Sequence, residues 1–104
     1  MKRMNINELE QKGGIYYEIG SATSFTGIVE TFYSNGQLEF KETYKNGKLD
    51  GPHKSYYENG ELKSEGNGVG VYKEYYNNGR IKEEIDENGS YKRYERNGKL
   101  MEKY

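Results

Sequence analysis

The sequence predicts an all-β protein: an elongated, mostly single-layer antiparallel meander of stacked β-hairpins, with about ten to twelve short strands. Two observations lead to this fold class. Asn-Gly pairs recur about every ten residues, and a longer aromatic pattern recurs at a nearly constant spacing. A third observation limits the core, because Leu, Ile, Val and Phe supply only 17 of the 104 residues while Tyr supplies 12. A large globular core is therefore excluded, and tyrosine must provide much of the buried apolar area.

The charges of the chain are balanced, with 16 basic and 17 acidic residues and a net charge of -1. Disordered chains usually combine low hydrophobicity with high net charge, so this balance favours a folded chain. It also argues against a nucleic-acid binder that works by neutralising phosphates. The sequence has no cysteine, which excludes disulfides and thiolate zinc sites, and no apolar run of the roughly 20 residues that a membrane helix needs.

The first third of the chain differs from the rest. Residues 1–13 are expected to form an N-terminal segment, in which Asn7-Glu8-Leu9-Glu10 resembles a capping box and predicts one short helical turn. Residues 14–104 are expected to form a single β-hairpin repeat domain, and residues 14–33 an atypical capping unit at its start. The basic N-terminus lacks the apolar stretch of a signal peptide. The expected location is therefore the cytoplasm, or outside it if a leader has been removed.

Seven glycines directly follow an asparagine, at glycine-to-glycine intervals of 11, 13, 8, 11, 10 and 9 residues. Asn-Gly is the strongest short-range signal for a hairpin, because both central residues of a type I′ turn need a positive φ. These intervals leave strands of about five to seven residues between turns. The predicted turn residues are Asn35, Gly36, Asn46, Gly47, Asn59, Gly60, Asn67, Gly68, Asn78, Gly79, Asn88, Gly89, Asn97 and Gly98.

Every second turn belongs to a longer unit of the form aromatic-aromatic-x-Asn-Gly-x-aliphatic. The unit starts at Phe32, Tyr56, Tyr75 and Tyr94, with spacings of 24, 19 and 19 residues. Such a period is typical of a repeat array, in which one hairpin buries its face only by stacking on its neighbours. The only proline, Pro52, predicts a strand start or a bulge, because a central strand would lose a hydrogen bond there.

No catalytic residue, metal ligand set or cofactor is predicted. The single histidine, His53, has no partner at metal-binding or catalytic spacing. The segments 66–70 and 86–89 superficially resemble a phosphate loop and a calcium loop, but both lack the required spacing and are expected to be turns. Glu83 and Glu84 crowd next to further acids, yet neighbouring residues of a strand point to opposite faces, which predicts a charged edge.

The tyrosines are the strongest candidates for a binding surface, because tyrosine combines rigid apolar area with a hydroxyl group. A doublet places one ring on each face of a sheet, and a single layer cannot bury both faces. A binding surface and a purely structural ladder remain open alternatives for the exposed rings. Glutamates beside the tyrosines argue against nucleic acid as a ligand. The candidate binding residues are Tyr56, Tyr57, Tyr75, Tyr76 and Tyr94.

Several stretches carry a family resemblance: 44–52 (YKNGKLDGP), 56–67 (YYENGELKSEGN), and, upstream, 16–21 and 25–27. They resemble the MORN-repeat variant of bacterial proteins in the YwqK family, which is described as a family of antitoxins. The resemblance covers roughly residues 14–104. It implies a non-enzymatic repeat scaffold that binds a partner protein, such as a toxin or an effector that it neutralises by occlusion. Family members of this kind often follow an export signal.

Three other functions remain as alternatives. A membrane-surface or phospholipid-headgroup binder would gather Lys and Arg on one face, whereas mixed charges would argue against it. A cell-wall or glycan-binding module would stack sugars on rows of tyrosine. An enzyme would need titratable groups that converge in one pocket. An open sheet has two free edges, so a homodimer through an edge or through the aromatic face is a further expectation.

Overall fold

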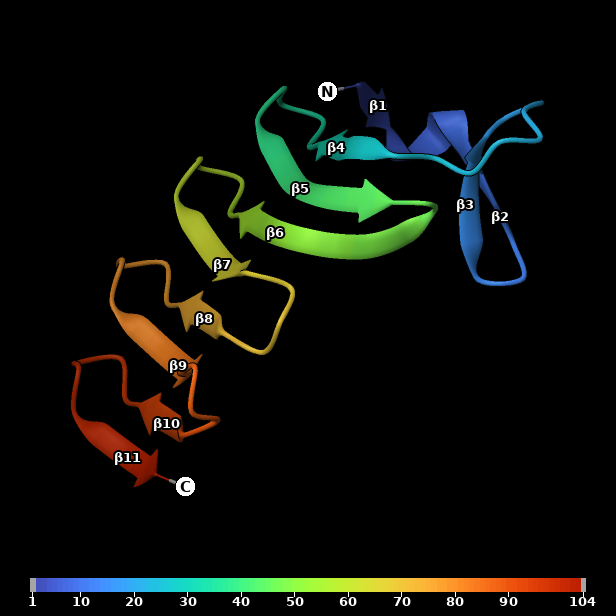
Figure 1. Cartoon of the computed structure of the whole chain (residues 1–104). Coiled ribbons are helices and arrows are strands. Elements are labelled where there is room, and N and C mark those ends of the chain that lie inside the picture. The colour runs from blue at the N-terminus through green and yellow to red at the C-terminus, as the bar shows by residue number, and fades with distance from the viewer. Residues whose placement is uncertain (1, 104) are drawn as a thin grey trace.

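The computed structural model describes residues 2–103, and within them it contains eleven β-strands and one short 3-10 helix. The predicted all-β meander is confirmed. Nine strands form one open sheet, and the molecule measures 49 × 34 × 22 Å along its principal axes (Figure 1). The helix in this part of the chain has three residues, far fewer than a helix that crosses a membrane.

The main sheet follows the chain from β4 to β11, and each strand there pairs antiparallel with the next (Figure 1). The strands β2 and β3 form a separate hairpin beside it. The one departure from an antiparallel meander is β1, which pairs parallel with β4. The elements are β1 (Arg3–Asn5), η1 (Ile6–Glu8), β2 (Leu9–Lys12), β3 (Ile15–Glu18), β4 (Gly27–Phe32), β5 (Leu38–Lys45), β6 (Lys48–Tyr56), β7 (Leu62–Gly66), β8 (Tyr72–Tyr75), β9 (Ile81–Ile85), β10 (Tyr91–Tyr94) and β11 (Leu100–Lys103).

The N-terminal helical turn lies at η1 and is capped by Asn5 rather than by the predicted Asn7. The Asn5 side chain accepts a hydrogen bond from the backbone N–H of Asn7 at 3.1 Å, and the Glu8 carboxylate accepts one from the Asn5 N–H at 2.9 Å. This is a capping box two residues earlier than expected. The later position fails because Leu9 is buried in the core and already begins strand β2.

The Asn-Gly turns use their asparagines differently from the prediction. Asn46 is the only non-glycine residue with a positive φ in residues 2–103, so among the Asn-Gly pairs only Asn46-Gly47 has both φ values of a type I′ turn. At Asn35-Gly36 the glycine alone has a positive φ, of 87°. The Gly36 N–H donates to the Tyr33 carbonyl at 3.0 Å, and the Tyr33 N–H donates to the Gln37 carbonyl at 2.8 Å. These bonds define a three-residue loop, a type I turn followed by a left-handed glycine.

The asparagine of this loop contributes its side chain. The Oδ1 atom of Asn35 accepts a hydrogen bond from the Gln37 backbone N–H at 2.9 Å, which closes the loop locally. The turns at the ends of the next three hairpins repeat the same backbone bonds and the same side-chain bond. Their asparagines are Asn59, Asn78 and Asn97.

The turns on the other side of the sheet form a second class. In the β7–β8 turn, Oδ1 of Asn67 accepts hydrogen bonds from two backbone N–H groups, and Oδ1 of Asp86 does the same in the β9–β10 turn. Counted from these residues, the left-handed glycines that correspond to one another are Gly70 and Gly89, with φ values of 107° and 80°. Gly70, rather than Gly68, is therefore the counterpart of Gly89, although Gly68 and Gly89 both follow an asparagine.

Pro52 lies at a bulge, as predicted. Across the β5–β6 pair, Glu42 opposes His53 and Tyr44 opposes Leu49, so that three residues of β6 face the single residue Thr43. The Thr43 hydroxyl donates to the Pro52 carbonyl at 2.9 Å. The bulge removes Pro52 from the regular ladder, where its missing N–H would leave a partner unsatisfied.

The buried core is small and lies at the N-terminal end of the described chain. It consists of Leu9, Phe25, Val29 and Tyr44, all less than 9% exposed, and the rings of Tyr16 and Tyr44 meet edge to face at 5.4 Å. Partly buried side chains complete it, namely Met4, Ile6, Tyr16 and Phe40. From β7 to β11 no described residue is buried, so this half of the sheet is one layer thick.

Candidate binding face

One face of β6–β10 carries a tyrosine and a lysine from every second strand. Side chains two residues apart in a strand share a face, which places Lys54 with Tyr56, Lys73 with Tyr75, and Lys92 with Tyr94. The cross-strand register shows that all of these side chains are on one side of the sheet. We call this side the tyrosine face.

The first feature of the tyrosine face is a row of alternating tyrosines and aliphatic residues. The register pairs Tyr56 with Leu62, Tyr75 with Ile81, and Tyr94 with Leu100. The three tyrosines are half-buried, and Leu100 is 46% exposed. This tyrosine–aliphatic row runs across the strands and gives the face an apolar stripe.

Two open hollows lie along this row and repeat after 19 residues. Leu62, Tyr75 and Gly79 line a hollow of about 370 Å³. Ile81, Tyr94 and Gly98 line the next one, of about 400 Å³. Equivalent residues of successive repeats therefore form equivalent concavities. Polar residues also line them, namely Glu61 and Asn78 in the first and Arg80 in the second. Shallow hollows that recur at a fixed interval suit a ligand that is itself extended and periodic.

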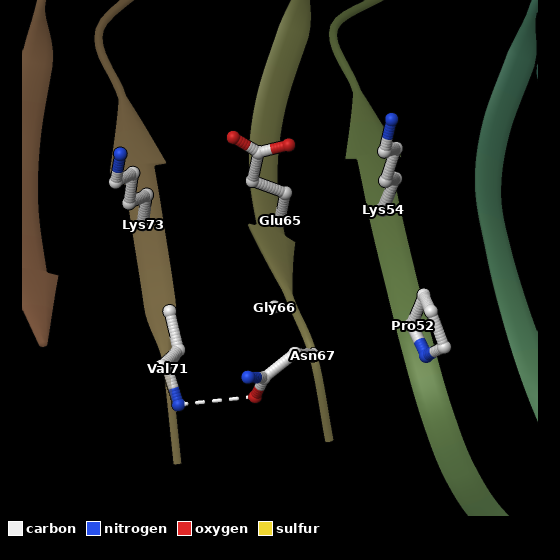
Figure 2. Close-up of a pocket in the computed structure, with 7 residues that line it drawn as sticks. All are labelled: Pro52, Lys54, Glu65, Gly66, Asn67, Val71 and Lys73. Carbon is white, nitrogen blue, oxygen red and sulfur yellow. Dashed lines mark hydrogen bonds between the residues drawn. The ribbon is translucent and has the colours of Figure 1, made fainter. Parts of the chain in front are cut away.

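The second feature is a row in which lysines and glutamates alternate on neighbouring strands. Glu65 opposes both Lys54 and Lys73, and Glu84 opposes both Lys73 and Lys92. Figure 2 shows Lys54, Glu65 and Lys73 side by side on three strands, above Pro52 and Val71, which line a third hollow of about 320 Å³. We call this the lysine–glutamate row.

The acids of this row are engaged by tyrosine hydroxyls. The Tyr75 hydroxyl donates to Oε1 of Glu65 at 2.8 Å, and the Tyr94 hydroxyl donates to Oε1 of Glu84 at 2.6 Å. Burial, followed by this hydrogen bond, raises the pKa of Tyr75 to about 12. The hydrogen bond to Glu84 is the main cause that raises the pKa of Tyr94. Both hydroxyls therefore remain protonated donors at neutral pH.

The lysines of the row are left without a close ionic partner. The four ion pairs within 4.0 Å among residues 2–103 involve other cations, and none includes Lys54, Lys73 or Lys92. Their glutamate neighbours accept hydrogen bonds from tyrosines instead. The face thus presents three ammonium groups, on β6, β8 and β10, that are free to pair with an external anion.

The second tyrosine of each doublet has a different position and contact. The Tyr57 hydroxyl donates to the Tyr75 carbonyl at 2.6 Å, and the Tyr76 hydroxyl donates to the Tyr94 carbonyl at 2.7 Å. Tyr33 makes the corresponding bond, to the Tyr56 carbonyl at 2.6 Å. Each of these side chains joins one hairpin to the backbone of the next hairpin.

The five tyrosines named from the sequence therefore form two groups. Tyr56, Tyr75 and Tyr94 lie together on the tyrosine face, whereas Tyr57 and Tyr76 link successive hairpins. The lysines and the aliphatic residues of the face were not named as candidates. Their recurrence at the same 19-residue spacing as the tyrosines is the sequence signal that identifies them.

The opposite face carries an acidic pair, Glu74 and Glu83, directly across from each other on β8 and β9. Burial raises the pKa of Glu74, and a hydrogen bond from the Tyr91 hydroxyl, at 2.7 Å, is the main cause that lowers the pKa of Glu83. Glu84 lies on the tyrosine face, and the Asp86 carboxylate is bonded within its own turn. The acids that crowd together in the sequence therefore do not converge in one pocket.

His53 lies in β6 and stacks on the ring of Tyr72, with ring centroids 6.4 Å apart. Gly66 lies between them on β7 in the register, and a Cβ atom there would come within 2.5 Å of the His53 ring. Within the described residues, no group of three His, Cys, Asp or Glu side chains is arranged to hold a metal ion. The histidine has a packing contact on this face.

The MORN repeat variant family matches four consecutive segments that together cover most of the chain, 25–46, 49–69, 68–86 and 87–104. The chain belongs to the MORN repeat variant family. Each matched segment contains one hairpin of the main sheet, from β4–β5 to β10–β11. MORN repeats are a non-catalytic module and generally serve as binding scaffolds. No curated protein and no solved structure matches the chain.

Proposed function

We propose that this MORN-repeat chain is a non-enzymatic scaffold that binds a partner protein through its tyrosine face. The observation that carries this proposal is the tyrosine–aliphatic row, in which half-buried rings and hollows recur on every second strand. Tyrosine is enriched where proteins bind one another, because its rigid ring and its hydroxyl contribute area and hydrogen bonds at little entropic cost. The single sheet places these rings at fixed intervals without a deep pocket.

The charge pattern favours a protein over a lipid surface. A headgroup binder would gather cations on one face, since anionic lipids attract clusters of Lys and Arg. On the tyrosine face lysines alternate with glutamates along one row. Such alternation is better suited to a ligand whose own charges are spaced, as the side chains of a protein are.

The resemblance to the YwqK family narrows this proposal to an antitoxin-like protein that neutralises a toxin or an effector by covering it. An elongated sheet with one continuous apolar stripe provides a contact surface of this kind, because occlusion needs area rather than chemistry. The stripe extends from β6 to β11, which is six strands.

The test is affinity capture from a native extract, followed by mass spectrometry, with the wild-type chain and matched variants. We expect Tyr75→Ser combined with Tyr94→Ser to lose the captured protein, and Tyr75→Phe to keep it because the ring remains. Val69→Ser is the control, since it removes a side chain that is 80% exposed and lies outside the tyrosine face. Circular dichroism and thermal unfolding of each variant establish that it is folded. Capture of the same protein by the double serine variant would contradict the proposal.

A further inference from the structure

The three free lysines of the tyrosine face lie on alternate strands and in one row. Neighbouring strands of a sheet are about 4.8 Å apart, so Lys54, Lys73 and Lys92 recur at about 9.6 Å and span about 19 Å in total. On β8, Lys73 lies two residues, about 7 Å along the strand, from Tyr75. A ligand that crosses the strands therefore meets an ammonium group and a tyrosine-lined hollow at the same interval.

This interval matches one backbone conformation better than the others. A polyproline II helix has three residues per turn and rises 3.1 Å per residue, so every third side chain returns to the same side after about 9.3 Å. In a β-strand, the side chains of residues i and i+3 point to opposite sides. In an α-helix, residues i and i+7 share a side but are about 10.5 Å apart, which accumulates an error of about 2 Å over two intervals.

We propose that the tyrosine face binds an acidic, proline-rich segment of its partner in the polyproline II conformation. The segment crosses β6, β8 and β10 and places a carboxylate at every third residue opposite Lys54, Lys73 and Lys92. This proposal rests on the proposed function, since it specifies the chemistry of the partner at the same face. Proline-rich segments suit tyrosine-lined grooves because they are already ordered before they bind.

The glutamates of the row determine the spacing of the ligand charges. Glu65 and Glu84 lie between the lysines, so a carboxylate opposite either of them is repelled. The favoured pattern is thus one acid followed by two neutral residues. The neutral residues then lie over the hollows to which Leu62 with Tyr75 and Ile81 with Tyr94 contribute apolar surface. A uniformly acidic segment carries more charge but satisfies this pattern less well.

The test measures the binding of fluorescently labelled peptides to the intact chain. The probe is three repeats of Pro-Pro-Glu, compared with three repeats of Pro-Pro-Lys, with nine consecutive glutamates, and with a helical peptide that has Glu at every seventh residue. We expect the Pro-Pro-Glu peptide to bind most tightly, and we expect its binding to weaken as salt is added. Equal or tighter binding of the polyglutamate or of the helical peptide would overturn the proposal.

A charge-reversal pair tests the lysines themselves. An exposed ion pair contributes up to about 1 kcal/mol. We therefore expect Lys73→Glu to weaken the binding of the Pro-Pro-Glu peptide by about fivefold or more. Lys99→Glu is the matched control, because Lys99 is exposed in the last turn and lies outside the row. A Lys73→Glu variant that binds the peptide as tightly as the Lys99→Glu variant would overturn the assignment.

Vesicles that contain an anionic phospholipid form the last arm. Vesicle binding that depends on Lys73, without peptide binding, would show a headgroup site and overturn the proposal. If no peptide binds but affinity capture still depends on Tyr75 and Tyr94, the proposed partner chemistry is wrong while the proposed function stands. If capture also fails to depend on these tyrosines, the proposed function is contradicted as well.

Discussion

At the scale of single residues, tyrosine hydroxyls hold successive repeats together. Tyr57 and Tyr76 each donate to a backbone carbonyl of the following hairpin, at 2.6 and 2.7 Å. These bonds join segments 18 residues apart in a half of the molecule that has no buried side chain. The second ring of each doublet is therefore part of the scaffold.

Removing one of these hydroxyls should lower stability without changing the fold. We expect Tyr57→Phe to cost about 1 kcal/mol in the free energy of unfolding, the usual contribution of one hydrogen bond. Tyr56→Phe is the matched control, because the Tyr56 hydroxyl has no hydrogen-bond partner within residues 2–103. Urea titrations measure both. If the two variants unfold at the same urea concentration, the hydroxyl of Tyr57 does not link the repeats.

A neighbouring segment of the chain is packed against the turn glycine Gly47. Its carbonyl accepts a hydrogen bond from the Tyr16 N–H at 2.9 Å, and its N–H donates to the Phe25 carbonyl at 2.7 Å. A Cβ atom at this position would lie 2.2 Å from a methyl carbon of Ile15 and 2.8 Å from the Tyr16 carbonyl oxygen. At Gly79, by contrast, a Cβ atom would meet nothing within 4 Å.

Substitutions of Gly47 and Gly79 distinguish the cost of backbone strain from the cost of a steric collision. Both have a positive φ, of 81° and 86°, so an alanine at either position pays the left-handed penalty of about 1 kcal/mol. We expect Gly79→Ala to cost about that amount, and Gly47→Ala to cost several kcal/mol because it also displaces the strand β3. Thermal unfolding of both variants checks this. Equal losses of stability would show that β3 does not hold this turn in place.

At the scale of the elements, the hairpin repeat was predictable because both its signals are local. Alternation and turn spacing determine the strands, and the aromatic unit determines their period. The turn type was not predictable from Asn-Gly alone, since asparagine also stabilises a turn through its side chain, as Asn35 does. The parallel pairing of β1 with β4 depends on contacts 25 residues apart, for which the local pattern holds no signal.

Asp86 and Asn67 occupy equivalent turns, so the asparagine at position 67 indicates what an asparagine would do at position 86. The Oδ1 atom of Asp86 accepts hydrogen bonds from the N–H groups of Asn88 and Ser90, at 2.9 and 3.0 Å. Asparagine makes the same two bonds at position 67, at 2.9 and 3.2 Å. We expect Asp86→Asn to preserve stability and Asp86→Ala to lose about 1 kcal/mol, measured by urea titration. An alanine variant as stable as the asparagine variant would refute this role.

At the scale of the whole molecule, the packing is uneven. The buried side chains lie between Leu9 and Tyr44, while β7 to β11 are held by backbone pairing, tyrosine hydroxyls and side-chain contacts between turns. The sequence indicated the thin sheet through its low aliphatic content. It did not indicate that residues before the first repeat complete the core, because Leu9 and the residues Met4, Ile6 and Tyr16 that pack with it belong to no matched repeat.

This uneven packing predicts a gradient of local stability along the sheet. In a repeat array, stability is roughly a sum of local and nearest-neighbour terms, so the hairpins farthest from the core open most easily. We expect backbone amides of β4 and β5 to exchange with deuterium most slowly, and those of β10 and β11 most quickly. Mass spectrometry of peptic fragments measures this order. Uniform protection across the nine strands would show that the sheet unfolds as one unit.

If the tyrosine face binds a protein and the opposite face does not, two adjacent residues of β10 should distinguish the two faces. Lys92 lies on the tyrosine face and Arg93 on the opposite face, where it opposes Glu83. A photo-crosslinking amino acid placed at one position or the other probes the two faces with an almost identical chain. We expect that, in a native extract, position 92 gives a discrete covalent adduct with another protein and position 93 does not. Equal adducts from both positions, or an adduct from position 93 alone, would contradict it.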